Sequence, residues 1–308
     1  MTTQSQLSPT PAARAKADSV LVFITAFWGW SFVIVKDALL CADPFTFLSL
    51  RFLLGALVGT AFAGKRMLDR YSVRSGLKLS LLLCAGYTLQ TCGLQYTTPS
   101  RSAFITGLCV VLVPFCSFII FKRAPRVFAL AGVALAATGL YLLTLAVEAT
   151  AATPKHQALG DFLTLLCAIA YAFHITLNER YAPNSKVTTL VATQLWVVSA
   201  VTGLLALLFP HHLDPRPSLW IAIAVTGTFG SAGAIVLQTW AQARTTAVRA
   251  ALIFALEPVF TSVYSQFMGV EHLGRPEVLG GALIISGVLV AELGGPLLER
   301  MRERGQSA

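Results

Sequence analysis

Hydrophobic residues in this chain come in ten long, nearly continuous stretches, and the polar residues gather in the short segments between them. A helix that crosses a bilayer needs roughly 20 apolar residues for a hydrocarbon core of about 30 Å. The pattern therefore predicts an all-α integral membrane protein with ten transmembrane helices. The predicted spans cover residues 20–39, 44–63, 77–97, 102–121, 127–147, 160–179, 188–209, 218–240, 247–268 and 277–295.

The ten stretches form two similar groups of five. Thr97–Phe104 resembles Thr245–Leu252, which lies 148 positions later, and Gly132–Leu140 resembles Gly280–Val288 at the same offset. Because five is an odd number, the second group must enter the membrane from the opposite side. The sequence thus predicts two inverted five-helix repeats related by a pseudo-two-fold axis in the membrane plane.

This pattern divides the chain into five parts. Residues 1–19 lack the apolar core of a signal peptide and are expected to be a disordered cytoplasmic tail. The first repeat covers 20–147, a linker covers 148–159, the second repeat covers 160–295, and a cytoplasmic tail covers 296–308.

The distribution of charge predicts the orientation in the membrane. Hydrophobic residues make up 56% of the chain and charged residues only 12%, whereas soluble domains carry about 25% charged residues. Of the 23 Lys and Arg residues, 17 fall on the side of the N-terminus, Arg51 lies within a span, and the opposite side has Lys36, Arg101, Lys155, Arg216 and Arg275. This asymmetry places both termini in the cytoplasm and argues against a nucleic-acid partner for the net charge of +9.

Several short motifs stand at matching places in the two groups of spans or at the start of the chain's first spans. They are Trp28-Gly29-Trp30-Ser31-Phe32-Val33-x-x-Lys36, Leu50-Arg51-Phe52-Leu53-Leu54, the matching openings of the fourth and ninth spans, and Leu256-Glu257-Pro258-Val259. In their order and spacing these motifs resemble the drug/metabolite transporter superfamily in its ten-helix, EamA-type branch. The resemblance covers about residues 20–295. It implies export or uptake of a small metabolite through a central cavity, often coupled to protons, and it implies no particular substrate.

Polar side chains inside the predicted spans recur at helical spacing, which places them on one face of each helix. Such stripes predict a polar cavity, and aromatic side chains can stack on an aromatic or cationic solute. The alternative is ordinary hydrogen bonding between helices, worth about 0.6 kcal/mol per contact. The predicted solute-binding residues are Trp30, Tyr87, Thr91, Gln95, Tyr171, His174, Asn178, Trp240, Glu257 and Tyr264.

Glu257 is the sharpest single candidate, because it lies near the middle of the ninth span and directly precedes Pro258. A proline removes one backbone hydrogen bond and bends a helix, and Pro114 is expected to do the same in the fourth span. Paired interruptions in corresponding helices point to a transporter's binding site. Glu257 can bind an amine or carry a coupling proton, as can His174; structural hydrogen bonding is the alternative for both.

The chain lacks the short motifs of metal, phosphate and nucleophile chemistry, so we expect no enzyme activity, cofactor or metal. Small-residue faces such as Gly55-x-x-x-Gly59 predict close helix packing or a dimer face. We therefore expect a monomer or weak homodimer in the cell membrane, in contact with lipid and a small solute. The predicted function is secondary active transport of a small metabolite; an amino acid or amine is the favoured solute, and efflux is the favoured direction. An intramembrane enzyme acting on a lipid-linked substrate and a gated channel remain alternatives.

Overall fold

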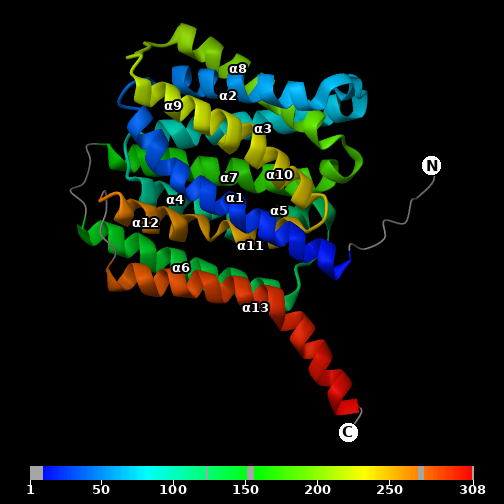
Figure 1. The fold of residues 1–308 in the computed structure, drawn as a ribbon. Helices are drawn as coiled ribbons and strands as arrows, with labels where there is room; N and C mark the ends of the chain where they lie inside the picture. The colour runs from blue at the N-terminus through cyan, green and yellow to red at the C-terminus, as the bar shows by residue number, and fades with distance from the viewer. Residues whose placement is uncertain (1–9, 123, 151–155, 270–273, 307–308) are drawn as a thin grey trace.

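The computed structural model describes residues 10–122, 124–150, 156–269 and 274–306, and these residues form a bundle of helices joined by short loops (Figure 1). Short 3-10 helices η1 (Gly64–Leu68) and η2 (Ala182–Asn184) and the π-helical segment η3 (Thr226–Gly233) interrupt the series. The α-helices are α1 (Pro11–Ala38), α2 (Pro44–Ala63), α3 (Arg70–Leu94), α4 (Pro99–Gly107), α5 (Cys109–Phe121), α6 (Val127–Thr150), α7 (Gln157–Tyr181), α8 (Val187–Leu208), α9 (Pro217–Val225), α10 (Ala234–Gln242), α11 (Ala247–Phe254), α12 (Glu257–Phe267) and α13 (Arg275–Gln306).

These elements follow the ten predicted spans in order. Three spans are each assembled from consecutive pieces: α4 with α5, α9 with η3 and α10, and α11 with α12. Over the described ranges, eight helical segments are long and apolar enough to cross a membrane, and two shorter apolar helices lie at Val127–Leu142 and Val278–Ala291. The predicted all-α architecture with many spans is therefore confirmed.

The ends of several helices differ from the expected boundaries. α1 begins at Pro11, so residues 11–19, which we expected in a disordered tail, are helical instead. The Thr10 side chain caps this helix by accepting the N–H of Ala13 at 3.3 Å, and Pro11 is preorganised for the first helical position. Likewise α13 continues to Gln306, and α6 and α7 extend into the predicted linker from both sides, with residues 151–155 outside the described ranges.

The contact between α6 and α13 shows the two-fold relation between the repeats. A Cβ atom on Gly132 would lie 2.5 Å from the carbonyl oxygen of Gly287, and one on Gly139 would lie 2.5 Å from that of Gly280. Gly280 and Gly287 are the residues 148 positions after Gly132 and Gly139, so the same contact occurs twice with the partners exchanged. Reciprocal contacts of this kind are characteristic of a two-fold axis. These small-residue faces therefore pack against each other within the chain.

The fourth and ninth spans also cross in this reciprocal way, because α4 contacts α12 and α5 contacts α11. The helix is interrupted at Leu108 in one span and at Ala255–Leu256 in the other, and Leu108 and Leu256 are 148 positions apart. At both interruptions the N–H bonds three residues back, from Leu108 to Ile105 at 3.1 Å and from Leu256 to Ile253 at 3.0 Å.

The prolines do not share this symmetry. Pro258 lies in the first turn of α12, directly after the interruption, so its missing N–H falls where the helix has just been broken. Pro114 lies inside α5, which continues through it. The interruption predicted at Pro114 is therefore found at Leu108, six residues earlier.

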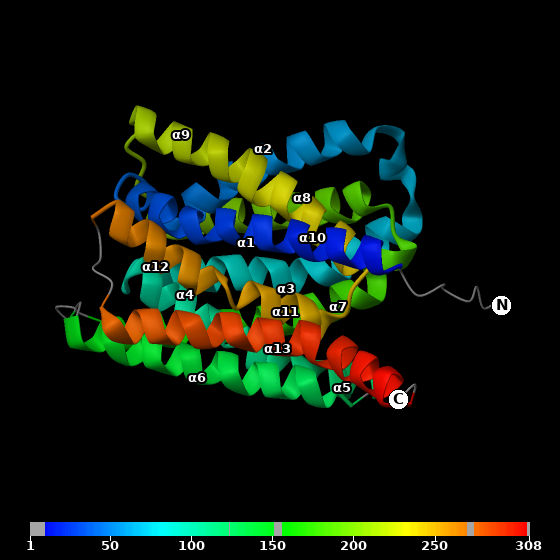
Figure 2. The same cartoon turned by 60° about the horizontal axis from the view of Figure 1, so that its bottom comes forward.

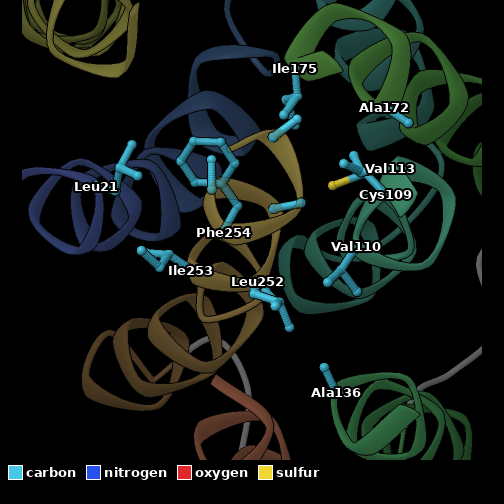
Figure 3. Close-up of a cluster of buried hydrophobic side chains, with 14 of the residues drawn as sticks. Leu21, Cys109, Val110, Val113, Ala136, Ala172, Ile175, Leu252, Ile253 and Phe254 are labelled. Carbon is cyan, nitrogen blue, oxygen red and sulfur yellow. The ribbon is translucent and has the colours of Figure 1, made fainter. Parts of the chain in front are cut away.

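A cluster of buried apolar residues centres on α11 and joins both repeats. Figure 3 shows Leu252, Ile253 and Phe254 between Leu21 of α1 and Val110 of α5. Each of these side chains is almost completely inaccessible. α1 begins and α13 ends at the same end of the bundle (Figure 2), as an even number of spans requires.

Candidate functional site: a cavity between the repeats

A cavity lies where the two repeats meet. The volume in which the centre of a water molecule can lie is about 70 Å³. This is well above the roughly 10–15 Å³ that one water requires on the same measure. Its walls combine aliphatic, aromatic, amide and charged side chains. The lining residues are Trp28, Ser31, Phe32, Val35, Arg51, Leu83, Tyr87, Gln90, Thr91, Leu94, Thr106, Cys109, Tyr171, His174, Ile175, Gln238, Phe254 and Glu257.

Most of the wall consists of pairs of equivalent positions from the two repeats, which places the cavity on the pseudo-two-fold axis. The offset is 143 positions between the first helices of the repeats and 148 positions further along. Among the lining residues, the equivalent pairs are Trp28 with Tyr171, Ser31 with His174, Phe32 with Ile175, Gln90 with Gln238, Thr106 with Phe254 and Cys109 with Glu257.

Glu257 is the first residue of α12 and its side chain is partly accessible from the cavity. Within the described residues, no hydrogen-bond donor contacts its carboxyl group. α1 approaches this segment closely because residue 29 has no side chain: a Cβ on Gly29 would lie 2.7 Å from Cβ of Phe260 and 3.1 Å from the Glu257 carbonyl oxygen. The neighbouring Trp28 lines the cavity, and its Nε1 donates to the Gly230 carbonyl oxygen at 3.1 Å.

Arg51 of α2 contributes the opposite charge. Its side chain is 97% buried, and its Nε donates to Ser231 Oγ at 2.9 Å. The guanidinium carbon lies 5.1 Å from the centroid of the Tyr87 ring and 5.4 Å from that of Phe52, which are cation–π distances. These contacts hold the Arg51 side chain within the protein, so it does not extend to the membrane surface.

His174 is held by a defined hydrogen bond. Its Nε2 lies 2.8 Å from Gln194 Oε1, and Gln194 Nε2 donates to the Leu190 carbonyl at 3.1 Å. Because the amide group of Gln194 presents its oxygen to the ring, Nε2 of His174 is the protonated nitrogen. Tyr171 is similarly oriented, since its hydroxyl donates to Gln90 Oε1 at 3.4 Å.

Half of the predicted solute-binding residues line this cavity: Tyr87, Thr91, Tyr171, His174 and Glu257. They come from the stripes on α3, α7 and α12. The structure thus brings these three stripes together around one space.

The other five predicted residues lie elsewhere. Asn178 is completely buried and donates to Gln242 Oε1 at 2.7 Å, so it joins α7 to α10. Gln95 is exposed at the end of α3. Trp30 packs edge-on against Phe27, with ring centroids 5.7 Å apart. Trp240, near the end of α10, and Tyr264 of α12 do not line the cavity.

Sequence reasoning missed Trp28 and Gln90 as cavity residues, and it placed Arg51 within a span without assigning it a role. The internal duplication carried a usable signal for two of these. Gln90 aligns with Gln238, which lies 148 positions later, and Trp28 aligns with Tyr171, which lies 143 positions later. An alignment of the two repeats therefore pairs Gln90 with a polar residue and Trp28 with an aromatic residue of the second repeat. Arg51 pairs with Gln194, and only the three-dimensional contacts show that it faces the cavity.

Two ion pairs lie at opposite ends of the bundle and are also related by the pseudo-symmetry. Arg101 of α4 contacts Asp161 of α7 with Nη2 2.8 Å from Oδ2, and its Nε also donates to the same carboxylate. Arg249 of α11 contacts Asp18 of α1 at 2.7 Å. Each ion pair joins the start of an interrupted span in one repeat to the first helix of the other repeat. The cavity lies between them.

Comparison with known proteins decides the family. The sequence profile of the EamA-like transporter family matches residues 15–145 and again residues 158–293. The chain belongs to this family. EamA proteins are transporters, so the chain is a multi-pass membrane protein built from two EamA repeats, and the family resemblance predicted from the sequence is confirmed.

Individual relatives agree with this membership. An uncharacterized transporter of Archaeoglobus fulgidus is 30% identical over 91% of this chain and 87% of its own length. A protein of Salmonella typhimurium named "probable amino-acid metabolite efflux pump" is 24% identical over 89% of this chain and 93% of its own. A crystal structure 20% identical in sequence matches 92% of this EamA chain and 99% of its own with a TM-score of 0.74, which supports the fold alone.

Proposed function

We propose that this EamA protein is a secondary active transporter that moves an amino acid or amine-type metabolite across the cell membrane, in the efflux direction, with both termini in the cytoplasm. The observation that carries the proposal is Glu257: a carboxyl group without a described hydrogen-bond donor, in a cavity on the axis between two inverted repeats. Intramembrane ionisable groups are costly and mark solute or proton pathways. The name of the Salmonella relative supports the choice of solute class.

The symmetry supports an alternating-access mechanism. Inverted repeats can exchange conformations, so that one end of the molecule opens as the other closes. The Arg101–Asp161 and Arg249–Asp18 ion pairs lie on either side of the cavity and cross between elements that must separate. In this mechanism each ion pair breaks when its own end opens and re-forms when that end closes.

Lys36 and Glu179 add a second pair of end contacts. Lys36 Nζ donates to the carbonyl oxygens of Leu94 at 2.7 Å and Thr97 at 2.9 Å, tying the end of α1 to the loop before α4. Glu179, 143 positions later, accepts the N–H of Ala247 at 2.6 Å at the start of α11. The two repeats therefore carry equivalent polar contacts at corresponding places.

Protonation couples transport to a gradient in this proposal, with Glu257 as the first candidate and His174 as the second. A carboxyl group that faces the cavity can release a proton when the cavity opens to one side and take one up when it opens to the other. Exchange of the proton for an amine would link the two fluxes, because the ammonium group and the proton compete for the same carboxylate.

The test is solute flux in proteoliposomes with and without a pH gradient, comparing the wild type with Glu257→Gln. Asp214→Asn is the matched control, since Asp214 pairs with Arg216 at 2.7 Å in an exposed loop. We expect the gradient to accelerate flux in the wild type and in Asp214→Asn, and to have no effect in Glu257→Gln. Equal, gradient-independent flux in all three proteins would contradict coupling through Glu257.

A further inference from the structure

Equivalent positions of the two repeats line the cavity, but the charges at these positions differ. Glu257 of the second repeat occupies the position held by Cys109 in the first, 148 positions earlier. Arg51 of the first repeat corresponds to Gln194 in the second, since α2 and α8 begin 143 positions apart. Each repeat therefore contributes one charge for which the other repeat has a neutral residue. One cation and one anion therefore make the two halves of the cavity wall different from each other.

Both charges have unused capacity for a ligand. The Arg51 Nε is bonded to Ser231 Oγ, whereas its two terminal nitrogens have no hydrogen-bond acceptor among the described residues. Glu257 and Arg51 form no ion pair with each other at 4.0 Å or less within those residues. A charge removed from water is unfavourable unless another group compensates it. The two groups can obtain this compensation from a solute that carries both opposite charges.

The other residues that line the cavity indicate the chemistry of the rest of the solute. Aliphatic and aromatic side chains dominate it, among them Phe32, Leu83, Leu94, Ile175 and Phe254. The ring of Phe254 lies edge-on to that of Trp28, with centroids 5.6 Å apart. An apolar group of a solute would be in contact with these side chains while its polar groups meet Arg51 and Glu257.

We infer that the cavity binds a zwitterionic α-amino acid with an apolar side chain, its carboxylate on the terminal nitrogens of Arg51 and its ammonium group on Glu257. A guanidinium presents two parallel N–H groups that match a carboxylate, and a carboxylate accepts the N–H groups of an ammonium ion. This inference rests on the proposed function and narrows its solute class, because an amine alone would leave Arg51 without a counter-charge.

The experiment measures binding to the purified full-length protein, by isothermal titration calorimetry, for two sets of three matched ligands. One set is L-leucine, 3-methylbutylamine and 4-methylpentanoate, and the other is L-phenylalanine, 2-phenylethylamine and 3-phenylpropionate. In the wild type we expect at least one of the amino acids to bind about tenfold or more tightly than either singly charged analogue of its set, since hydrogen bonds to charged groups are strong. Equal affinities within both sets would overturn the inference.

Two variants assign the ends of the ligand. Arg51→Gln should weaken the amino acid and the carboxylate about tenfold or more and leave the amine unchanged, whereas Glu257→Gln should weaken the amino acid and the amine and leave the carboxylate unchanged. Arg216→Gln, at an exposed loop, is the control and should change none of the three. A loss of all three ligands to the same extent in Arg51→Gln, with a monodisperse elution profile, would show a structural role and overturn the assignment.

The outcome separates this inference from the proposed function. If the charge pattern of binding appears but proteoliposomes show no flux, the transport proposal fails and the amino-acid site stands. If flux of an amine or another solute is observed and does not depend on Arg51, transport stands and the zwitterion site fails. Where Arg51→Gln does not fold, the order of the three ligands in the wild type decides alone.

Discussion

Arg101 and Asp161 form a two-point ion pair between α4 and α7, and the pseudo-symmetry places a second ion pair between α11 and α1, where Arg249 Nη2 lies 2.7 Å from Asp18 Oδ2. Arg101 and Arg249 are 148 positions apart, and the two aspartates are 143 apart. In each case the arginine lies in the first turn of a helix that begins at a threonine cap, Thr98 or Thr246. Equivalent ion pairs thus join the two repeats at opposite ends of the bundle.

Loss of one ion pair should favour opening at its own end. Cys109 lines the cavity and can report access when the other five cysteines are replaced. In Asp161→Asn we expect a membrane-impermeant maleimide to label Cys109 about tenfold faster from the outer side, the side predicted for Arg101. In Asp18→Asn we expect the same increase from the cytoplasmic side. A tenfold change corresponds to about 1.4 kcal/mol, which lies between the values for exposed and buried ion pairs.

The labelling experiment has its control in Asp214→Asn, which removes an exposed ion pair in a loop away from the cavity. This variant should label at the wild-type rate from both sides. Faster labelling from the same side in Asp161→Asn and Asp18→Asn would contradict the assignment of the two ion pairs to opposite ends.

The packing of α6 on α13 predicts a strong effect of one added methyl group. In Gly132→Ala the new Cβ would lie 2.5 Å from the Gly287 carbonyl oxygen and 2.8 Å from Cβ of Ala291, so the helices must move apart. We expect a loss of stability of about 1–3 kcal/mol, as for other overpacked contacts. In the control Gly281→Ala the nearest atom is a Val259 methyl carbon at 3.6 Å. Thermal unfolding in detergent should show a lower apparent Tm for the first variant and little change for the second.

Asp69 is expected to make the stability of the folded protein depend on pH in the acid range. Its carboxylate accepts hydrogen bonds from the Ser72 hydroxyl and from the Ser72 N–H at 2.9 Å, at the start of α3. These bonds lower the pKa of Asp69 below its usual value of 3.8. A lowered pKa means that the ionised form stabilises the folded state above pH 3.8, and that this contribution is lost as the pH falls through the lower, folded-state pKa.

The matching measurement is the apparent Tm of the wild type and Asp69→Asn as a function of pH. The wild type should have the higher Tm by a constant amount between pH 7 and about pH 5, and the difference should shrink below about pH 4. A difference that stays constant down to pH 3, or that grows there, would contradict a role for the ionised carboxylate.

The fold was predictable because its main determinants are local and repeated. A run of apolar residues specifies a span regardless of its neighbours, and the duplication with an odd number of spans specifies an inverted pair. The glycines that join α6 to α13 were recognisable for the same reason, since each occurs twice. The first helix was predicted too short because residues 11–19 are polar, although Thr10 and Pro11 are good signals for the start of a helix.

The site was only partly predictable, because helical spacing identifies a face but not what that face meets. Tyr171 and Asn178 lie on the same stripe of α7, yet Tyr171 lines the cavity whereas Asn178 donates a hydrogen bond to Gln242 of α10. Arg51 could be placed only from the contacts with Ser231 and Tyr87, which come from helices far away in the sequence.

The most direct test of the account is counterflow of amino acids in proteoliposomes that contain only this EamA protein. Vesicles loaded with a mixture of unlabelled L-leucine and L-phenylalanine are diluted into a trace of the labelled compounds. A carrier with a cavity between inverted repeats predicts a transient accumulation of label above its external concentration, and its disappearance when Arg51 and Glu257 are both replaced by Gln. Simple equilibration of the label without accumulation, or accumulation of equal size in that double variant, would contradict it.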